Sequence, residues 1–237
     1  MRTRTFRSKI LRRLATYAEA GAQSCRKWYR NQELADGSLS AAKAIHTHMT
    51  ARELHALYDL AANVGKSGKV LEIGSYLGAS SCYLTAALSL LDGHLYCVDT
   101  WENQAMPDRE WDTFREFQRN TREVAAFITP VRKRSDEIAA SDFAQPLDLI
   151  FIDADHSYSS VRGDYARVRD WVIDGGILAF HDCTYFESVS RVLGEVLASG
   201  SWQLAGNVDS LVWLRKIGPA FPFPNPMGNG EFPTPTR

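Results

Sequence analysis

The sequence predicts an α/β fold in which a doubly wound sheet of seven strands, mostly parallel, carries helices on both faces. Three observations lead to this fold class. From Lys69 onward, short apolar runs alternate with amphipathic segments. Two of the runs, 149–152 and 177–180, are continuously apolar, as in strands buried on both faces. Two closing strands near 201–205 and 209–216, joined at Gly206-Asn207, predict a C-terminal antiparallel hairpin.

The remaining elements follow in order along the chain. A helix opens at Thr50, where Thr50 and Glu53 form a capping box, and it ends at Gly65. Strands are then expected at 69–74, 94–99, 127–133, 147–153 and 175–181. Helices are expected at 77–91, 109–125, 135–141, 157–172 and 185–198. This alternation of strand and helix is typical of parallel neighbours in one sheet.

A length of 237 residues and a hydrophobic content of 45% fit one domain with extensions at both ends. We expect a basic helical extension over 1–49, the main domain over 50–217 and a Pro-rich, extended tail over 218–237. Residues 1–30 carry nine Lys and Arg against Glu19 alone. For this basic segment we favour packing on the domain or on a second subunit, as in a homo-oligomer, over a membrane-surface contact or a transit peptide.

Composition and charge exclude several classes of protein. Beyond the first 30 residues the chain is acidic, with 18 Lys and Arg against 27 Asp and Glu, so we expect no nucleic-acid partner. The longest apolar stretches are only as long as strands, which predicts no membrane-spanning helix. Four scattered cysteines without paired spacing indicate reduced thiols and a cytoplasmic protein.

The first predicted strand leads into a glycine turn, in the stretch K-V-L-E-I-G-S-Y-L-G-A-S-S from 69 to 81. Gly74 and Gly78 let the backbone bend tightly and approach a ligand that a Cβ would exclude. The helix that begins there directs unpaired N–H groups to the same place, with Ser75 in the turn. Glu72 ends a core strand, where a carboxylate is costly unless something uses it. The stretch therefore predicts a binding site for a nucleotide-like ligand.

Five consecutive predicted strands bring carboxylates or histidines to one rim of the sheet. In strand order, these are Glu72, Asp99, Ser135-Asp136, Asp153-Ala-Asp155-His156 and His181-Asp182. Ligands of open parallel sheets bind beyond this carboxyl edge. Asp99 is suited to the two hydroxyls of a ribose, and Ser135-Asp136 to the amino group of an adenine. Helix caps explain any one of these residues more easily than all five, so the rim predicts an adenosine-bearing cofactor.

These motifs resemble the class I methyltransferases that use S-adenosyl-L-methionine, over roughly residues 50–216. The resemblance rests on V-L-E-I-G-S-Y-L-G at 70–78, V-D at 98–99 and D-A-D-H at 153–156. It implies a Rossmann-like fold and S-adenosylmethionine as the cofactor. The residues that it implies for cofactor binding are Glu72, Gly74, Ser75, Gly78, Asp99, Ser135, Asp136 and Asp153.

Within that class, D-L-I-F-I-D-A-D-H-S-Y at 148–158 and G-G-I-L-A-F-H-D at 175–182 are similar to the small metal-dependent O-methyltransferases, in the group that includes sugar O-methyltransferases and cephalosporin-hydroxylase-like proteins. Asp153 and Asp182 match the ligands of a divalent metal there. His181 stands where catechol-type enzymes have an aspartate, so it either ligates the metal or lines the pocket. This donor set favours Mg²⁺ or Mn²⁺ over zinc. His156 is the candidate catalytic base beside Asp153, with a solvent-facing histidine as the alternative.

The sequence thus predicts metal-assisted O-methylation of a sugar or another hydroxylated small molecule. One alternative is an NAD-dependent oxidoreductase, which the missing G-x-G-x-x-G disfavours. Another is a non-methylating relative on the same fold, either hydroxylase-like or a binding module. The segment 101–111, with two tryptophans and Met106, is interpreted either as a lid or acceptor platform or as core packing.

Overall fold

The computed structural model describes residues 38–102 and 111–218, together with a few positions between 21 and 31. The first 20 residues of the predicted basic helical extension and nearly all of the Pro-rich tail lie outside the described residues. So does the middle of the segment 101–111. No described helix is both long enough and apolar enough to cross a membrane.

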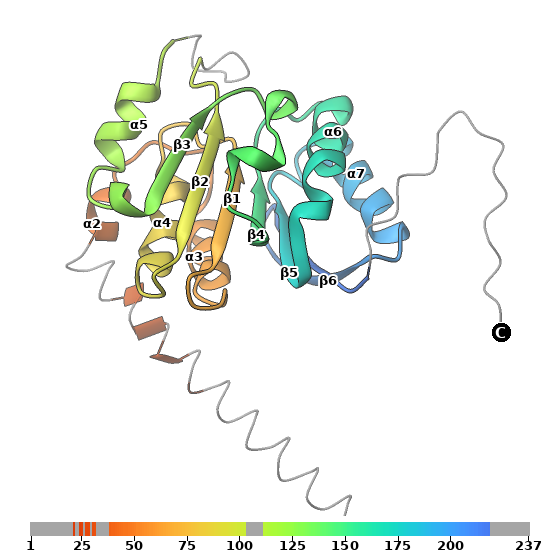
Figure 1. Cartoon of the computed structure of the whole chain (residues 1–237), viewed down its shortest axis with the longest axis horizontal. Coiled ribbons are helices and arrows are strands. Elements are labelled where there is room, and N and C mark those ends of the chain that lie inside the picture. The colour runs from red at the N-terminus through yellow and green to blue at the C-terminus, as the bar shows by residue number, and fades with distance from the viewer. Residues whose placement is uncertain are drawn as a thin grey trace, which may run out of the picture.

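Seven strands form one sheet, as predicted, in the order β3-β2-β1-β4-β5-β7-β6 (Figure 1). The strands are β1 (Lys69–Ile73), β2 (His94–Asp99), β3 (Ile128–Arg132), β4 (Leu147–Ile152), β5 (Val172–Phe180), β6 (Trp202–Val208) and β7 (Leu211–Lys216). The first five pair in parallel, and β7 pairs antiparallel with both β5 and β6. Because β1 lies between β2 and β4, the strand order reverses there, and such a reversal opens a crevice at the carboxyl ends of the strands.

Helices cover both faces of the sheet and bury a separate core on each (Figure 1). Residues of α2 (Ser38–Ala42), α3 (Ala51–Ala61), α4 (Ala79–Ser89) and α5 (Phe114–Asn120) belong to one core. Residues of α6 (Tyr158–Val168) and α7 (Glu187–Ala198) belong to the other. Leu39, Ala42 and Met49 are buried in the first core, so this core includes part of the segment that the sequence analysis assigned to the N-terminal extension.

Local chemistry explains where some elements begin. The predicted capping box is present at α3: Thr50 Oγ1 accepts the Glu53 N–H, and Glu53 Oε2 accepts the Thr50 N–H at 2.8 Å.

Of the two tryptophans around the predicted lid, Trp101 is fully buried and packs on Phe114 and Phe117 with ring centroids 4.8 Å away in both cases. Trp101 is therefore a core residue.

Several predicted boundaries are wrong. The helix expected at 135–141 is replaced by two short 3₁₀ turns, η2 (Ser135–Glu137) and η3 (Ala140–Asp142). Strand β5 begins at Val172, where the sequence predicted the end of a helix. The hairpin turns at Asp209-Ser210, and Gly206-Asn207 lies within β6. Gly206 is needed for packing, because a Cβ there would lie 2.4 Å from the ring of Trp213.

Candidate active site

The glycine turn lies where the strand order reverses, and it fits against the loop after β4. Gly74 has a φ of +89°, and a Cβ on it would come within 1.9 Å of the Asp153 carbonyl oxygen. No other residue could occupy this position without moving the two loops apart. Gly78 also has a φ of +89° and precedes α4. A Cβ on Gly78 would lie 2.7 Å from the Thr121 side chain, so both glycines make room for neighbouring segments of the protein, whereas the sequence predicted room for a ligand.

Glu72 lies beneath the glycine turn and lines neither of the two cavities at the rim. It is fully buried, and burial raises the pKa of its carboxyl group. It accepts hydrogen bonds from the hydroxyls of Ser75, at 2.8 Å, and Ser81. The structure thus gives Glu72 a role in holding the turn to the start of α4, where the sequence predicted contact with the cofactor.

Asp99, at the end of β2, binds the same turn from the other side. Its Oδ2 accepts the backbone N–H groups of Ser75 at 2.9 Å and Tyr76 at 2.8 Å, and its Oδ1 accepts that of Trp101 at 2.7 Å. Tyr76 has a positive φ of 43°. Residues other than glycine rarely adopt this backbone conformation, and the hydrogen bonds to Asp99 stabilise it. Asp99 also lines a cavity, so its remaining lone pairs are available to a ligand.

Two cavities meet at the turn and share Gly74, Tyr76, Asp153 and Ala154. The larger has a volume of about 710 Å³, and the smaller about 470 Å³. Asp99 and Ser135 line the smaller cavity, as the predicted ribose and adenine contacts require. Asp136 does not line it, because its carboxylate is exposed and pairs with Arg134 at 3.0 Å. Aromatic and histidine rings line much of the larger cavity: His46, His48, Tyr76, His156, His181, Tyr185 and Phe186.

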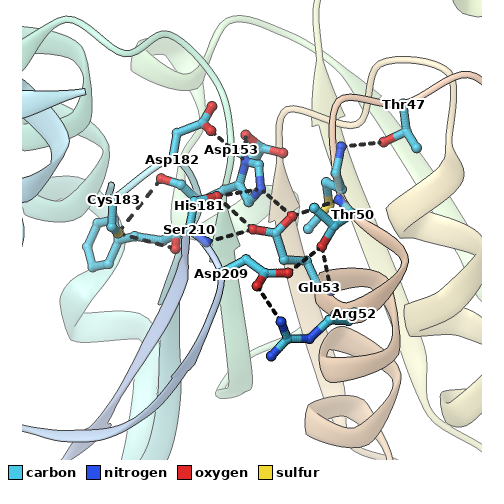
Figure 2. A network of polar contacts seen from close by, with 12 residues as sticks. Thr47, Thr50, Arg52, Glu53, Asp153, His181, Asp182, Cys183, Asp209 and Ser210 are labelled. Carbon is cyan, nitrogen blue, oxygen red and sulfur yellow. Dashed lines mark hydrogen bonds and ion pairs between the residues drawn. The ribbon is translucent and has the colours of Figure 1, made fainter. Parts of the chain in front are cut away.

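Asp153, His181 and Asp182 converge at the floor of the larger cavity, with one potential ligand atom from each lying within 4.8 Å of the others (Figure 2). His181 Nδ1 lies 3.2 Å from Asp153 Oδ1 and 3.4 Å from Asp182 Oδ1. Burial disfavours the charged imidazole, but the two carboxylates outweigh it and raise the pKa of His181 to about 11. Burial likewise opposes the charged form of Asp182, yet contacts with His156 and His181 hold its pKa well below the usual range.

His156 lies beside this cluster, on the loop after β4. Its Nε2 is 2.9 Å from Asp182 Oδ2 and 4.0 Å from Asp153 Oδ1. The carboxylates of Asp153 and Asp182 raise the pKa of His156 to about 9. The imidazole stacks on Phe186, with ring centroids 4.2 Å apart. All four residues that the sequence predicted for metal binding and base catalysis are thus together.

Other residues of the site were missed by the sequence analysis. Glu53 and Ser210 contact Nε2 of His181, on the side of the ring away from Asp153 and Asp182. The sequence gave no reason to expect the Glu53 contact, because the capping box already explains a glutamate at this position. His46 and His48 belong to the larger cavity, together with Tyr76, whose ring centroid lies 6.2 Å from each of theirs. From the sequence, these two histidines are interpreted either as loop residues beside a helix or as residues at the rim of a pocket, and the structure favours the second interpretation.

Comparison with known proteins supports the same interpretation. A family model described as a methyltransferase domain matches residues 71–183, from β1 to just past Asp182. This match, the fold and the strand-end site all agree with the resemblance of the sequence to class I S-adenosylmethionine-dependent methyltransferases.

Solved structures with low sequence identity share the fold. One is the O-methyltransferase TomG from Streptomyces achromogenes, involved in tomaymycin synthesis and bound to S-adenosylmethionine; the match has 17% identity and a TM-score of 0.58 and covers 80% of this chain and 95% of that one. An S-adenosylmethionine-dependent O-methyltransferase from Thermotoga maritima matches with 12% identity and a TM-score of 0.54, and the match covers 73% of this chain and 68% of that one. An rRNA methylase from Streptococcus thermophilus matches with 14% identity and a TM-score of 0.53, and the match covers 71% of this chain and 99% of that one.

Proposed function

We propose that the protein transfers a methyl group from S-adenosylmethionine to a hydroxyl oxygen of a small molecule, assisted by Mg²⁺ or Mn²⁺. The observation that carries this proposal is the convergence of Asp153, His181 and Asp182 in the cavity that also contains the glycine turn. The adenosine part of the cofactor belongs beside Asp99 and Ser135 in the smaller cavity. The acceptor belongs in the larger one.

The donor set fits a hard divalent cation. His181 is only 3% exposed, and its Nδ1 has no hydrogen-bond partner within the part of the chain that the structure describes. That atom faces both carboxylates, and two carboxylates with one imidazole suit Mg²⁺ or Mn²⁺. When bound, the cation would orient the acceptor oxygen and lower its pKa.

His156 supplies the base in this proposal. An alcohol is a poor nucleophile, so its proton must leave as the oxygen–carbon bond forms and the carbon–sulfur bond of the sulfonium breaks. With a pKa of about 9, His156 is protonated at neutral pH while Asp153 and Asp182 are free of a cation. A cation held by the two carboxylates would lower that pKa, and Nε2, at the edge of the ligand cluster, could then receive the proton. Stacking on Phe186 restricts the rotation of the imidazole, and Asp182 orients its Nε2.

The surface of the larger cavity supports a hydroxylated, ring-shaped acceptor. Tyr185 is 72% exposed at its rim, beside the partly exposed Phe186. Tyr76, His46 and His48 supply further ring faces. Aromatic faces pack well on the apolar face of a sugar or on another planar ring, and the cluster below them is anionic before a cation binds.

The test is a transfer assay with isotopically labelled S-adenosylmethionine and Mg²⁺. Sugars, phenols and a structured rRNA fragment are offered separately as acceptors, and products are identified by mass spectrometry. We expect labelled methyl groups on the hydroxyls of one class of small molecule. Transfer to RNA alone, or to nitrogen or carbon atoms of the small molecules, would contradict the proposed acceptor chemistry.

A further inference from the structure

Glu53 reaches the metal cluster from the opposite side of His181, between α3 and the β6–β7 hairpin (Figure 2). It is 1% exposed. Its Oε1 accepts the backbone N–H and the hydroxyl of Ser210, at 2.9 and 2.7 Å. Its Oε2 accepts the Thr50 N–H and lies 3.2 Å from Nε2 of His181. A capping box needs only the contact with Thr50, so the other contacts require a separate explanation.

The hydrogen bonds around His181 determine which of its nitrogens carries hydrogen. The Ser210 hydroxyl donates to Glu53 Oε1, so its oxygen, 3.1 Å from His181 Nε2, can only accept there. Glu53 Oε2 is a carboxylate oxygen and also accepts. Both polar neighbours of Nε2 are therefore acceptors, and Nε2 must carry a hydrogen. The other nitrogen, Nδ1, faces the carboxylates of Asp153 and Asp182, so in the metal-free protein it also carries a hydrogen, which a bound cation would displace.

We infer that Glu53 is a positioning residue that keeps the hydrogen of His181 on Nε2, so that the lone pair of Nδ1 faces the divalent cation. The inference rests on the proposed function, because it concerns the same cation. A carboxylate that accepts from the outer nitrogen of a ligating histidine fixes both the tautomer and the orientation of the ring. His181 is thereby assigned as a ligand, which decides between the two alternatives that the sequence left open.

Glu53→Gln is the most informative variant, because a glutamine has nearly the same shape but only one acceptor oxygen. In wild type, both carboxylate oxygens accept, one from Ser210 and the other from Thr50. If the glutamine oxygen serves the two Ser210 donors, its NH₂ group faces His181 Nε2. That arrangement favours the tautomer with hydrogen on Nδ1, which blocks the cation.

Asp209→Asn provides a matched control at the same junction. Asp209 binds Arg52 at 2.9 Å and the Thr50 hydroxyl at 2.8 Å. No contact between it and His181 is seen among the described residues. Its φ of +50° is one that asparagine tolerates. The variant removes a negative charge near α3 without changing the hydrogen bonds of His181.

The experiment measures Mn²⁺ affinity by calorimetry on the full chain without cofactor, and the His181 tautomer by ¹⁵N NMR in the Mg²⁺-saturated protein. We expect Glu53→Gln to weaken Mn²⁺ binding about 10- to 100-fold and to shift hydrogen towards Nδ1, while Asp209→Asn matches wild type. Ser210→Ala, which removes one donor to Glu53, should weaken binding less. If circular dichroism shows that Glu53→Gln does not fold, Ser210→Ala replaces it in both measurements.

The outcomes separate this inference from the proposed function. If wild type binds Mn²⁺ and Glu53→Gln matches it in affinity and tautomer, the role of Glu53 is wrong while metal-assisted transfer stands. If wild type binds neither Mn²⁺ nor Mg²⁺, metal assistance itself is wrong and the role of Glu53 fails with it. An equal loss in Asp209→Asn would also overturn the inference, because the effect would then follow from disturbing the junction.

Discussion

Nε2 of His156 lies 2.9 Å from Oδ2 of Asp182, which joins the loop after β4 to the loop after β5 at the cavity floor. The two residues are far apart in the sequence, and the parallel pairing of β4 with β5 brings their loops together. This arrangement places the proposed proton acceptor directly beside a proposed metal ligand.

His156→Ala tests whether that proton acceptor is the base. The variant should keep normal affinity for cofactor and Mn²⁺, because His156 is not among the proposed ligands. Turnover should fall about 100-fold or more, the usual effect of losing a general base. Single-turnover kinetics measures the chemical step. His94→Ala serves as the control, since His94 begins β2 and binds Thr129 away from both cavities. Normal turnover in His156→Ala, with chemistry limiting the rate, would leave another group as the base.

Asp99→Ala should weaken S-adenosylmethionine binding by about 1.5–3 kcal/mol, the range for hydrogen bonds to a charged group. The loss combines the ribose contacts with the support that Asp99 gives to Ser75 and Tyr76. Asp136→Ala should bind the cofactor much more nearly as wild type does, because the Asp136 side chain is exposed and does not line the cavity. Titration calorimetry compares the two variants. Equal losses would contradict the assignment of these acids, and unchanged affinity in a folded Asp99→Ala would remove Asp99 from the site.

Asp164→Asn should stabilise the protein above pH 6. Burial on α6 raises the pKa of Asp164 to about 6, although contacts with Ser135 and Arg167 act in the opposite direction. The native state therefore binds this proton more tightly than the unfolded chain does, and ionisation costs stability as pH rises from about 4 to 6. The difference between variant and wild type should reach about 2 kcal/mol at pH 7 and disappear below about pH 4. Urea unfolding at several pH values measures it, and a difference independent of pH would show that Asp164 titrates normally.

The sheet was predicted well from the sequence, because the residue pattern is clear in the strands and at their carboxyl ends. Its local signals are the buried runs of β4 and β5, the glycine turn after β1 and the polar residues at the strand ends. Because the strands are parallel, their carboxyl ends lie at one rim of the sheet. The boundaries at 135–141 and at Gly206-Asn207 were predicted less well. Gly206 resembles a turn residue in the sequence, but it is required because the Trp213 ring occupies the space of its missing side chain.

The site was predictable only to the extent that each residue followed a strand directly. Asp153, His181 and Asp182 are such residues. Glu72 lies near the end of β1, but it is buried in the core, where Ser75 and Ser81 donate to its Oε2. Glu53 comes from a helix and contacts Ser210 from a hairpin 157 residues further along the chain, a long-range contact that no local pattern encodes.

The most direct test of metal-assisted transfer compares the chelated and the reconstituted enzyme. Protein treated with EDTA and freed of chelator is assayed with labelled S-adenosylmethionine and an accepted hydroxyl compound, without metal and then with Mg²⁺ or Mn²⁺. We predict no transfer without metal and full recovery on addition of either ion. Asp182→Ala should stay inactive under both conditions while binding the cofactor normally. Full activity in the metal-free protein would contradict the account.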